Sequence, residues 1–162
     1  MNWPKIAVIF LTLLYITGTK ATEPQTKGLV TLNVPEEVHV NQAKTGELKV
    51  KISVKDGYHV QANPASQEFL IPVNIENISA EGISFGKPEY PVGNPFKIET
   101  SDDPLSVYDG KFIITLPFET ANDSEIAQTE VNGTFRYQTC DAKRCYFPRS
   151  IEFSVPVKII NK

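Results

Sequence analysis

Apolar residues occupy every second position along four long segments of this chain, and this alternation restricts its fold more than any other feature. The segments cover residues 48–54, 112–118, 131–137 and 151–159. A β-strand turns successive side chains to opposite faces of its sheet, so each segment is expected to be a strand that buries one face. Burial of a single face is typical of antiparallel sheets. Weaker forms of the pattern occur at 29–34, 69–75 and 83–85.

Turn-forming dipeptides separate the segments, as expected for short strands that reverse direction often. They are Asp56-Gly57, Asn63-Pro64, Glu81-Gly82, Asp109-Gly110 and Asn132-Gly133. Seven or more short strands of this kind predict an all-β chain, folded as an immunoglobulin-like antiparallel β-sandwich. Residues 86–108, rich in Pro and Gly, form the longest stretch without a strand pattern. A loop of that length in a compact domain is usually functional or disordered.

The first 21 residues have the three parts of a secretory signal peptide. Lys5 supplies a positive charge, residues 6–16 form an apolar run, and the segment from Gly18 offers small residues before a cleavage point after Ala21. The alternative is an uncleaved membrane anchor, but the apolar run is too short to cross about 30 Å of hydrocarbon. We therefore expect residues 1–21 to be removed and residues 22–162 to form one exported domain without stable membrane insertion. We expect it in the periplasm, or secreted if the host is not Gram-negative.

Removal of Lys5 and Lys20 with the signal peptide reduces the basic residues from 16 to 14, against 19 acidic ones, for a formal net charge of −5. Nucleic-acid binding needs a concentrated positive charge, so this class of function is excluded. About 140 residues are enough for one domain with a hydrophobic core of its own. We expect a monomer that does not need a disulfide merely to fold.

The two cysteines, Cys140 and Cys145, lie between two of the long strand segments, so the four residues between them are expected at the tip of a hairpin. In an oxidising compartment a disulfide between them is the default. A ring this small stabilises a fold by only about 2 kcal/mol, against nearly 5 kcal/mol for a loop of about a hundred residues. That difference favours redox chemistry over a structural staple.

Charged residues lie close to the pair in the sequence. Lys143 and Arg144 are expected to favour the thiolate of Cys145, which is the form that exchanges. Asp141 acts in the opposite sense on Cys140. Three aromatic residues are placed to shield the sulfurs: Tyr137, Tyr146 and Phe147. These features leave two functions open, namely reversible thiol–disulfide exchange and a non-catalytic binding or assembly domain whose disulfide only pins a hairpin.

A metal site is a third alternative, because the two cysteines together with His39 and His59 would supply four ligands. The cysteine spacing is not that of a zinc knuckle. Both histidines lie in strand-like runs, where a histidine is far more often a surface or packing residue. We therefore expect neither a metal nor another cofactor.

The stretch from Tyr137 to Pro148, which reads Tyr-Gln-x-Cys-x-x-x-x-Cys-Tyr-x-Pro, resembles the signature of the N-terminal periplasmic domain of the thiol:disulfide interchange reductase DsbD. The similarity extends to residues 54–59 and to the segment that ends at 107–111. The resemblance implies an immunoglobulin-like domain that receives reducing equivalents from a membrane donor. It would pass them to periplasmic disulfide isomerases and to thioredoxin-like proteins of cytochrome c maturation. A redox-active pair would make the chain a thiol–disulfide oxidoreductase of the protein-disulfide reductase type.

The resemblance also implies roles for single residues. Cys145 would form the mixed disulfide with partners, and Cys140 would resolve it. Four residues separate the cysteines here, whereas the best-known members of the family have five. The chain ends at Lys162, without the membrane and thioredoxin-like parts, so a separate membrane thiol reductase is the expected electron donor.

The family shields its disulfide with a loop that carries an acidic pair followed by Phe. The matching residues here are Asp102, Asp103 and Leu105, so either Leu105 or Tyr108 is expected to cover the sulfurs. Residues 96–108 would then act as a lid that opens when a partner docks. Tyr58 is expected to line the floor of the site.

Overall fold

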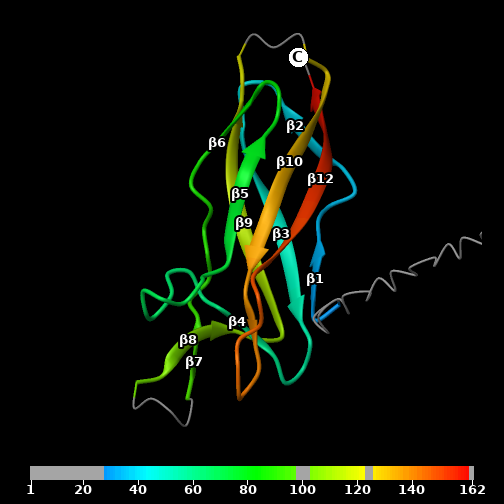
Figure 1. Cartoon of the computed structure of the whole chain (residues 1–162). Helices are drawn as coiled ribbons and strands as arrows, with labels where there is room; N and C mark the ends of the chain where they lie inside the picture. Colours follow the sequence, from blue (N-terminus) through cyan, green and yellow to red (C-terminus); the bar gives the residue numbers. More distant parts are fainter. Residues whose placement is uncertain (1–27, 98–102, 123–125, 161–162) are drawn as a thin grey trace, which may run out of the picture.

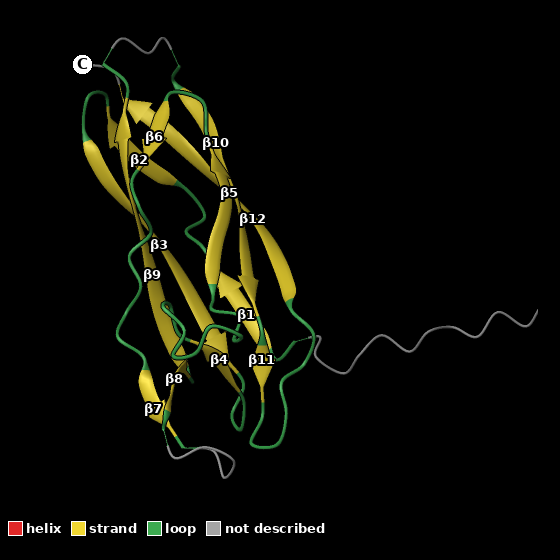
Figure 2. Ribbon diagram, turned by 60° about the vertical axis from the view of Figure 1, so that its left-hand side comes forward, coloured by secondary structure: helices red, strands yellow, loops and turns green. Residues whose placement is uncertain are grey.

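The computed structural model describes residues 28–97, 103–122 and 126–160, and the predicted signal peptide lies outside these ranges. Within them every regular element is a β-strand (Figure 2). In chain order the strands are β1 (Val30–Asn33), β2 (Val38–Asn41), β3 (Thr45–Val54), β4 (His59–Gln61), β5 (Asn74–Ser79), β6 (Ile83–Phe85), β7 (Asn94–Phe96), β8 (Leu105–Tyr108), β9 (Lys111–Thr120), β10 (Gln128–Tyr137), β11 (Thr139–Cys140) and β12 (Arg149–Ile160). A search of the described ranges finds no helix long and apolar enough to cross a membrane.

The strands form two larger sheets and a smaller one at one end of the molecule (Figure 1). The larger sheets have the strand orders β1-β3-β9-β6 and β2-β12-β10-β5, and the smaller has the order β11-β4-β8-β7. The described strand pairs are antiparallel except for β2 and β12, which run parallel. The predicted immunoglobulin-like antiparallel β-sandwich is thus confirmed, with this one parallel pair as an exception.

The four long alternating segments are the four longest described strands, β3, β9, β10 and β12, and each buries alternate residues as predicted. The weaker segments 29–34 and 83–85 are confirmed as β1 and β6. The prediction of a strand over residues 69–75 is wrong at its start, because Phe69 is 78% exposed and the strand begins only at Asn74. The N–H of Leu70 donates to the carbonyl of Gln67 at 3.1 Å, so the chain closes a turn there instead.

The predicted turn at Asn132-Gly133 is also wrong, since both residues lie inside β10. Gly133 pairs with Phe153 of β12, and a Cβ on this glycine would lie 2.5 Å from the phenyl ring. The missing side chain therefore makes room for the ring and does not mark a reversal of the chain. The long stretch at 86–108 contains more structure than expected, because β7 and β8 lie within it.

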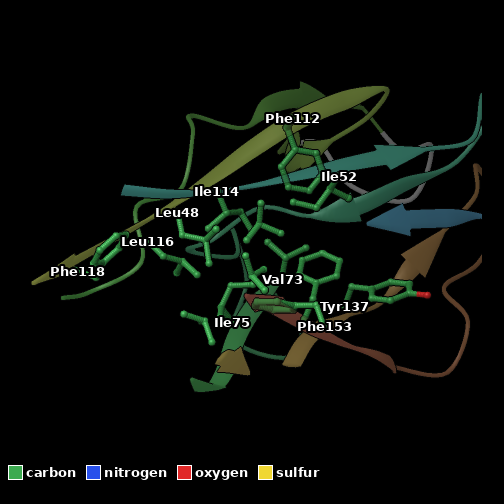
Figure 3. Packing of buried hydrophobic residues seen from close by; sticks show 14 of the residues in the cluster. Leu48, Ile52, Val73, Ile75, Phe112, Ile114, Leu116, Phe118, Tyr137 and Phe153 are labelled. Carbon is green, nitrogen blue, oxygen red and sulfur yellow. The ribbon is translucent and has the colours of Figure 1, made fainter. Parts of the chain in front are cut away.

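The core lies between the two larger sheets, where side chains of β3 and β9 meet those of β5, β10 and β12 (Figure 3). Leu48, Ile114 and Phe135 are almost completely buried in it. The smaller sheet continues from this core, since β4 follows β3 after one turn, β11 follows β10 and β8 leads into β9. Long core strands thus hold the three segments that meet at the end of the sandwich.

Candidate functional site

The two cysteines are joined by a disulfide in the hairpin between β10 and β12. Their sulfurs are 1.96 Å apart and their Cα atoms 3.9 Å apart. Cys140 belongs to β11 and is only 1% exposed, whereas Cys145 lies on the outer arm of the hairpin and is exposed. One end of the disulfide is therefore open to an incoming group and the other is enclosed by the protein.

Asp141 organises the tip of this hairpin. Its Oδ1 accepts hydrogen bonds from the backbone N–H groups of Lys143 at 2.8 Å and of Arg144 at 2.9 Å. Its Oδ2 accepts a hydrogen bond from the hydroxyl of Tyr146 at 2.7 Å. This last bond and the two backbone bonds lower the pKa of the Asp141 carboxyl, since each stabilises its charged form. The same contact raises the pKa of the Tyr146 hydroxyl.

The basic residues of the tip, Lys143 and Arg144, are both exposed. The guanidinium of Arg144 lies 5.2 Å from the centre of the Tyr146 ring, within the range of a cation–π contact. Tyr146 in turn has its ring centre 6.3 Å from that of Tyr58. The structure thus brings together three of the residues named from the sequence, Arg144, Tyr146 and Tyr58.

Strand β4 supports the enclosed cysteine from the inside. In the antiparallel pair of β11 and β4, Cys140 lies directly opposite His59. The side-chain Nε2 of Gln61, two residues further along β4, donates a hydrogen bond to the Sγ of Cys140 at 3.6 Å. His59 and Gln61 are both buried, at 3% and 0% exposure. The ring of Phe96 packs on His59 with a centroid distance of 4.2 Å.

Burial of His59 lowers the pKa of its imidazole, because desolvation penalises the charged form. The carboxylates of Asp109 and Asp141 act against this shift, but they do not reverse it. Near neutral pH the imidazole opposite Cys140 is therefore uncharged.

A pocket of about 480 Å³ opens beside the hairpin. Two of the predicted turns form much of its wall, with Gly57 and Gly110 each at a positive φ of 83° and 58°. The residues that line it are Asp56, Gly57, Tyr58, His59, Phe96, Asp109, Gly110 and Ala142. Tyr58 lines this pocket. The sequence predicted Tyr58 on the floor of the site. The position of Ala142 in the hairpin connects the pocket to the disulfide.

Three other residues named from the sequence, Tyr137, Tyr108 and Leu105, are buried. Tyr137 is buried in the core cluster, with its ring centre 5.3 Å from that of Phe135. Tyr108 is also in this cluster, and its hydroxyl donates a hydrogen bond to the carbonyl of Pro91 at 2.7 Å. Leu105 is buried in β8, where it pairs with Phe96 of β7.

The acidic pair expected in the shielding loop is only partly described. Asp103 is exposed just before β8. Asp102 lies outside the described residues, together with the central part of the segment 96–108 that the sequence suggested as a lid.

The four residues considered as metal ligands do not gather at one place. His39 belongs to β2, where it contacts Glu37, whereas His59 belongs to the smaller sheet. Within the described ranges, no three His, Cys, Asp or Glu side chains are arranged to hold a metal ion.

Sequence reasoning missed Gln61 and Phe96, and it considered His59 only as a metal ligand. Strand β4 is three residues long and all three are buried, so it carries no alternation by which to recognise a buried face. The only available signal was the position of His59 and Gln61, two residues apart, just after the Asp56-Gly57 turn.

The sequence model of the family described as "Thiol:disulfide interchange protein DsbD, N-terminal" matches residues 27–156. No curated protein matches the chain in sequence.

Two solved structures resemble the fold. The N-terminal periplasmic domain of ScsB from Proteus mirabilis has a TM-score of 0.49 and 13% identity, over 80% of this chain and 45% of that one. This chain thus spans less than half of that protein. The DsbD N-terminal domain of Neisseria meningitidis, in the reduced form, has a TM-score of 0.47 and 16% identity, over 84% of this chain and 90% of that one. Because the family match covers most of the chain and includes both cysteines, the chain belongs to the family of the N-terminal domain of the thiol:disulfide interchange protein DsbD.

Proposed function

We propose that this domain relays reducing equivalents in the periplasm through a reversible Cys140–Cys145 disulfide. A separate membrane thiol reductase would be the donor, and thioredoxin-like proteins or disulfide isomerases would be the acceptors. The observation that carries the proposal is the contrast between an exposed Cys145 and a Cys140 that is 1% exposed. A disulfide with one accessible sulfur directs each exchange through that sulfur, which a relay between two partners requires.

The uptake of electrons proceeds in two displacements. A thiolate of the donor attacks the Sγ of Cys145, the disulfide breaks, and its electron pair leaves on Cys140 as a thiolate. The second donor thiolate then attacks the donor sulfur of the mixed disulfide and expels Cys145. The donor ends as a disulfide, and the domain ends as a dithiol that has gained two electrons, with protons taken up from solvent.

Delivery reverses these steps. The Cys145 thiolate attacks a disulfide of the acceptor and displaces one acceptor thiolate. Cys140 then attacks Cys145 in the mixed disulfide, which restores the intramolecular disulfide and releases the reduced acceptor. The exposed charges of Lys143 and Arg144 favour the Cys145 thiolate in this direction. Tyr146, next to Cys145 in the chain, contacts the ring of Tyr58, and Leu105 or Tyr108 would cover the sulfurs.

The reduction potential of the Cys140–Cys145 disulfide tests this proposal. We would equilibrate the domain with glutathione buffers of known composition and measure the reduced fraction by thiol labelling. A relay requires a reduction potential above about −300 mV, within reach of thioredoxin-like proteins. A potential well below that value would instead indicate the alternative function, a non-catalytic binding domain with a structural hairpin disulfide.

A further inference from the structure

Gln61 occupies a position on β4 that its neighbours fix from both sides. Its backbone pairs with Val107 of β8, and its carbonyl accepts a hydrogen bond from the N–H of Val73 at 3.0 Å. Directly paired residues of two antiparallel strands share a face, as do residues two apart on one strand. His59, Gln61 and Cys140 therefore face the same side of the smaller sheet. The hydrogen bond from Nε2 of Gln61 to Sγ of Cys140 agrees with this placement.

The amide of Gln61 is only half satisfied. Its Nε2 donates to the sulfur, whereas its Oε1 is buried without a hydrogen-bond partner among the described residues. An unpaired buried oxygen costs free energy, so a glutamine held there only for folding would be a poor choice. Two forms of Cys140 would explain this arrangement. Nε2 of Gln61 would donate a hydrogen bond to the Cys140 thiolate, and Oε1 would accept one from the Cys140 thiol.

We propose that Gln61 is a catalytic residue of the exchange, because its side-chain amide stabilises the Cys140 thiolate that forms when a partner attacks Cys145. The proposal rests on the function proposed above. The displaced electron pair ends on a sulfur that is almost fully buried, where a charge without a partner is costly. A hydrogen bond to a charged acceptor is about twice as strong as one to a neutral acceptor, so the bond from Gln61 strengthens as the charge develops.

The charged groups near Cys140 cannot take the place of the Gln61 amide in stabilising the Cys140 thiolate. His59 faces Cys140, but burial lowers its pKa and leaves the imidazole uncharged near neutral pH. The carboxylate of Asp141 carries the same sign of charge as the thiolate. Lys143 and Arg144 are on the exposed side of the hairpin, next to Cys145.

Two measurements on the full domain test the proposal. The first is the second-order rate constant for reduction of the disulfide by dithiothreitol in the wild type, in Gln61→Met and in Thr139→Val. Methionine keeps the length of the side chain and removes the donor. Thr139 is the matched control, because it is 2% exposed, its hydroxyl has no hydrogen-bond partner among the described residues, and it faces the opposite side of β11 from Cys140.

The rate constant should fall about tenfold in Gln61→Met, since a thiolate that loses one charge-assisted hydrogen bond is a poorer leaving group. In Thr139→Val it should stay within about twofold of the wild type. Equal rate constants in all three proteins, or an equal fall in both variants, would overturn the role of Gln61.

The second measurement is the thiol pKa of Cys140 in the Cys145→Ser background, followed by the ultraviolet absorbance of the thiolate. Adding Gln61→Met should raise this pKa by about one unit, whereas a purely structural role leaves it unchanged. If Gln61→Met does not fold, Gln61→Glu replaces it. Its carboxylate would repel the Cys140 thiolate, so the rate constant per dithiothreitol thiolate should fall as the carboxyl ionises. A rate constant that does not change with pH in that range, after this correction for the thiolate fraction of dithiothreitol, would contradict the proposal.

The two proposals fail in different ways. A potential far below −300 mV contradicts the relay, yet the disulfide can still be reduced and the effect of Gln61 measured. A normal potential with no effect of Gln61→Met on rate or thiol pKa contradicts only the role of Gln61.

Discussion

His59 is the buried titratable side chain that faces Cys140, and its depressed pKa links the site to stability. The unfolded chain binds a proton at this histidine near pH 6.5, whereas the folded domain binds it only at lower pH. At pH values between the pKa of His59 in the unfolded chain and its lower pKa in the folded domain, the unfolded state holds more protons. Acidification therefore favours unfolding. The stabilisation is complete above pH 6.5 and is lost as the pH falls through the lower pKa of the folded domain.

We therefore predict that the domain loses stability between about pH 7.5 and pH 5.5, and that His59→Tyr removes part of this loss. Tyrosine keeps an aromatic ring against Phe96 without a charge that titrates in this range. Urea unfolding at the two pH values checks the prediction. The same loss in the wild type and in His59→Tyr would show that His59 is not its source.

Single residues of the site differ in how far sequence alone predicts them. The cysteine pair is predictable because its spacing and its flanking residues form a motif, and the expected export makes the disulfide the default. Gln61 is not predictable in this way. Its role depends on the register between β4 and β11, which joins residues 79 positions apart in the chain.

Gly133 shows how β10 and β12 depend on one another. A Cβ at this position would lie 2.5 Å from the ring of Phe153, which is itself buried. Gly133→Ala should therefore destabilise the domain by about 1–3 kcal/mol through overpacking. Asn132→Ala, on the neighbouring exposed position of the same strand, is the control and should change stability by less than about 0.5 kcal/mol. Chemical denaturation of both variants measures the difference, and equal values would contradict the packing described here.

The long strands are predictable because each runs for ten residues or more with one buried face. The strands of the smaller sheet are not, because β4, β7, β8 and β11 have two to four residues each. An alternation needs several repeats before it can be recognised. Tertiary pairing with neighbours, rather than local sequence, makes these short segments into strands.

In the molecule as a whole, the hydrophobic core and the disulfide lie in different regions. The core lies between the two larger sheets, and the Cys140–Cys145 ring lies at the end of the sandwich, next to the smaller sheet. Since the disulfide closes a ring with a sequence separation of only 5, its reduction should cost about 2 kcal/mol of stability. The reduced domain should remain folded with a single cooperative transition. Urea unfolding with and without dithiothreitol tests this, and unfolding on reduction alone would mean that the disulfide is structural.

The central claim is that exchange passes through the exposed Cys145 and is completed by the enclosed Cys140. The most direct measurement mixes two reduced variants, Cys140→Ser and Cys145→Ser, separately with an oxidised thioredoxin-like protein and follows the mixed disulfide by mass. We predict that Cys140→Ser accumulates an adduct at Cys145, whereas Cys145→Ser, whose remaining sulfur belongs to a residue only 1% exposed, reacts at least about tenfold more slowly. Equal rates for the two variants, or no adduct with either, would contradict the claim.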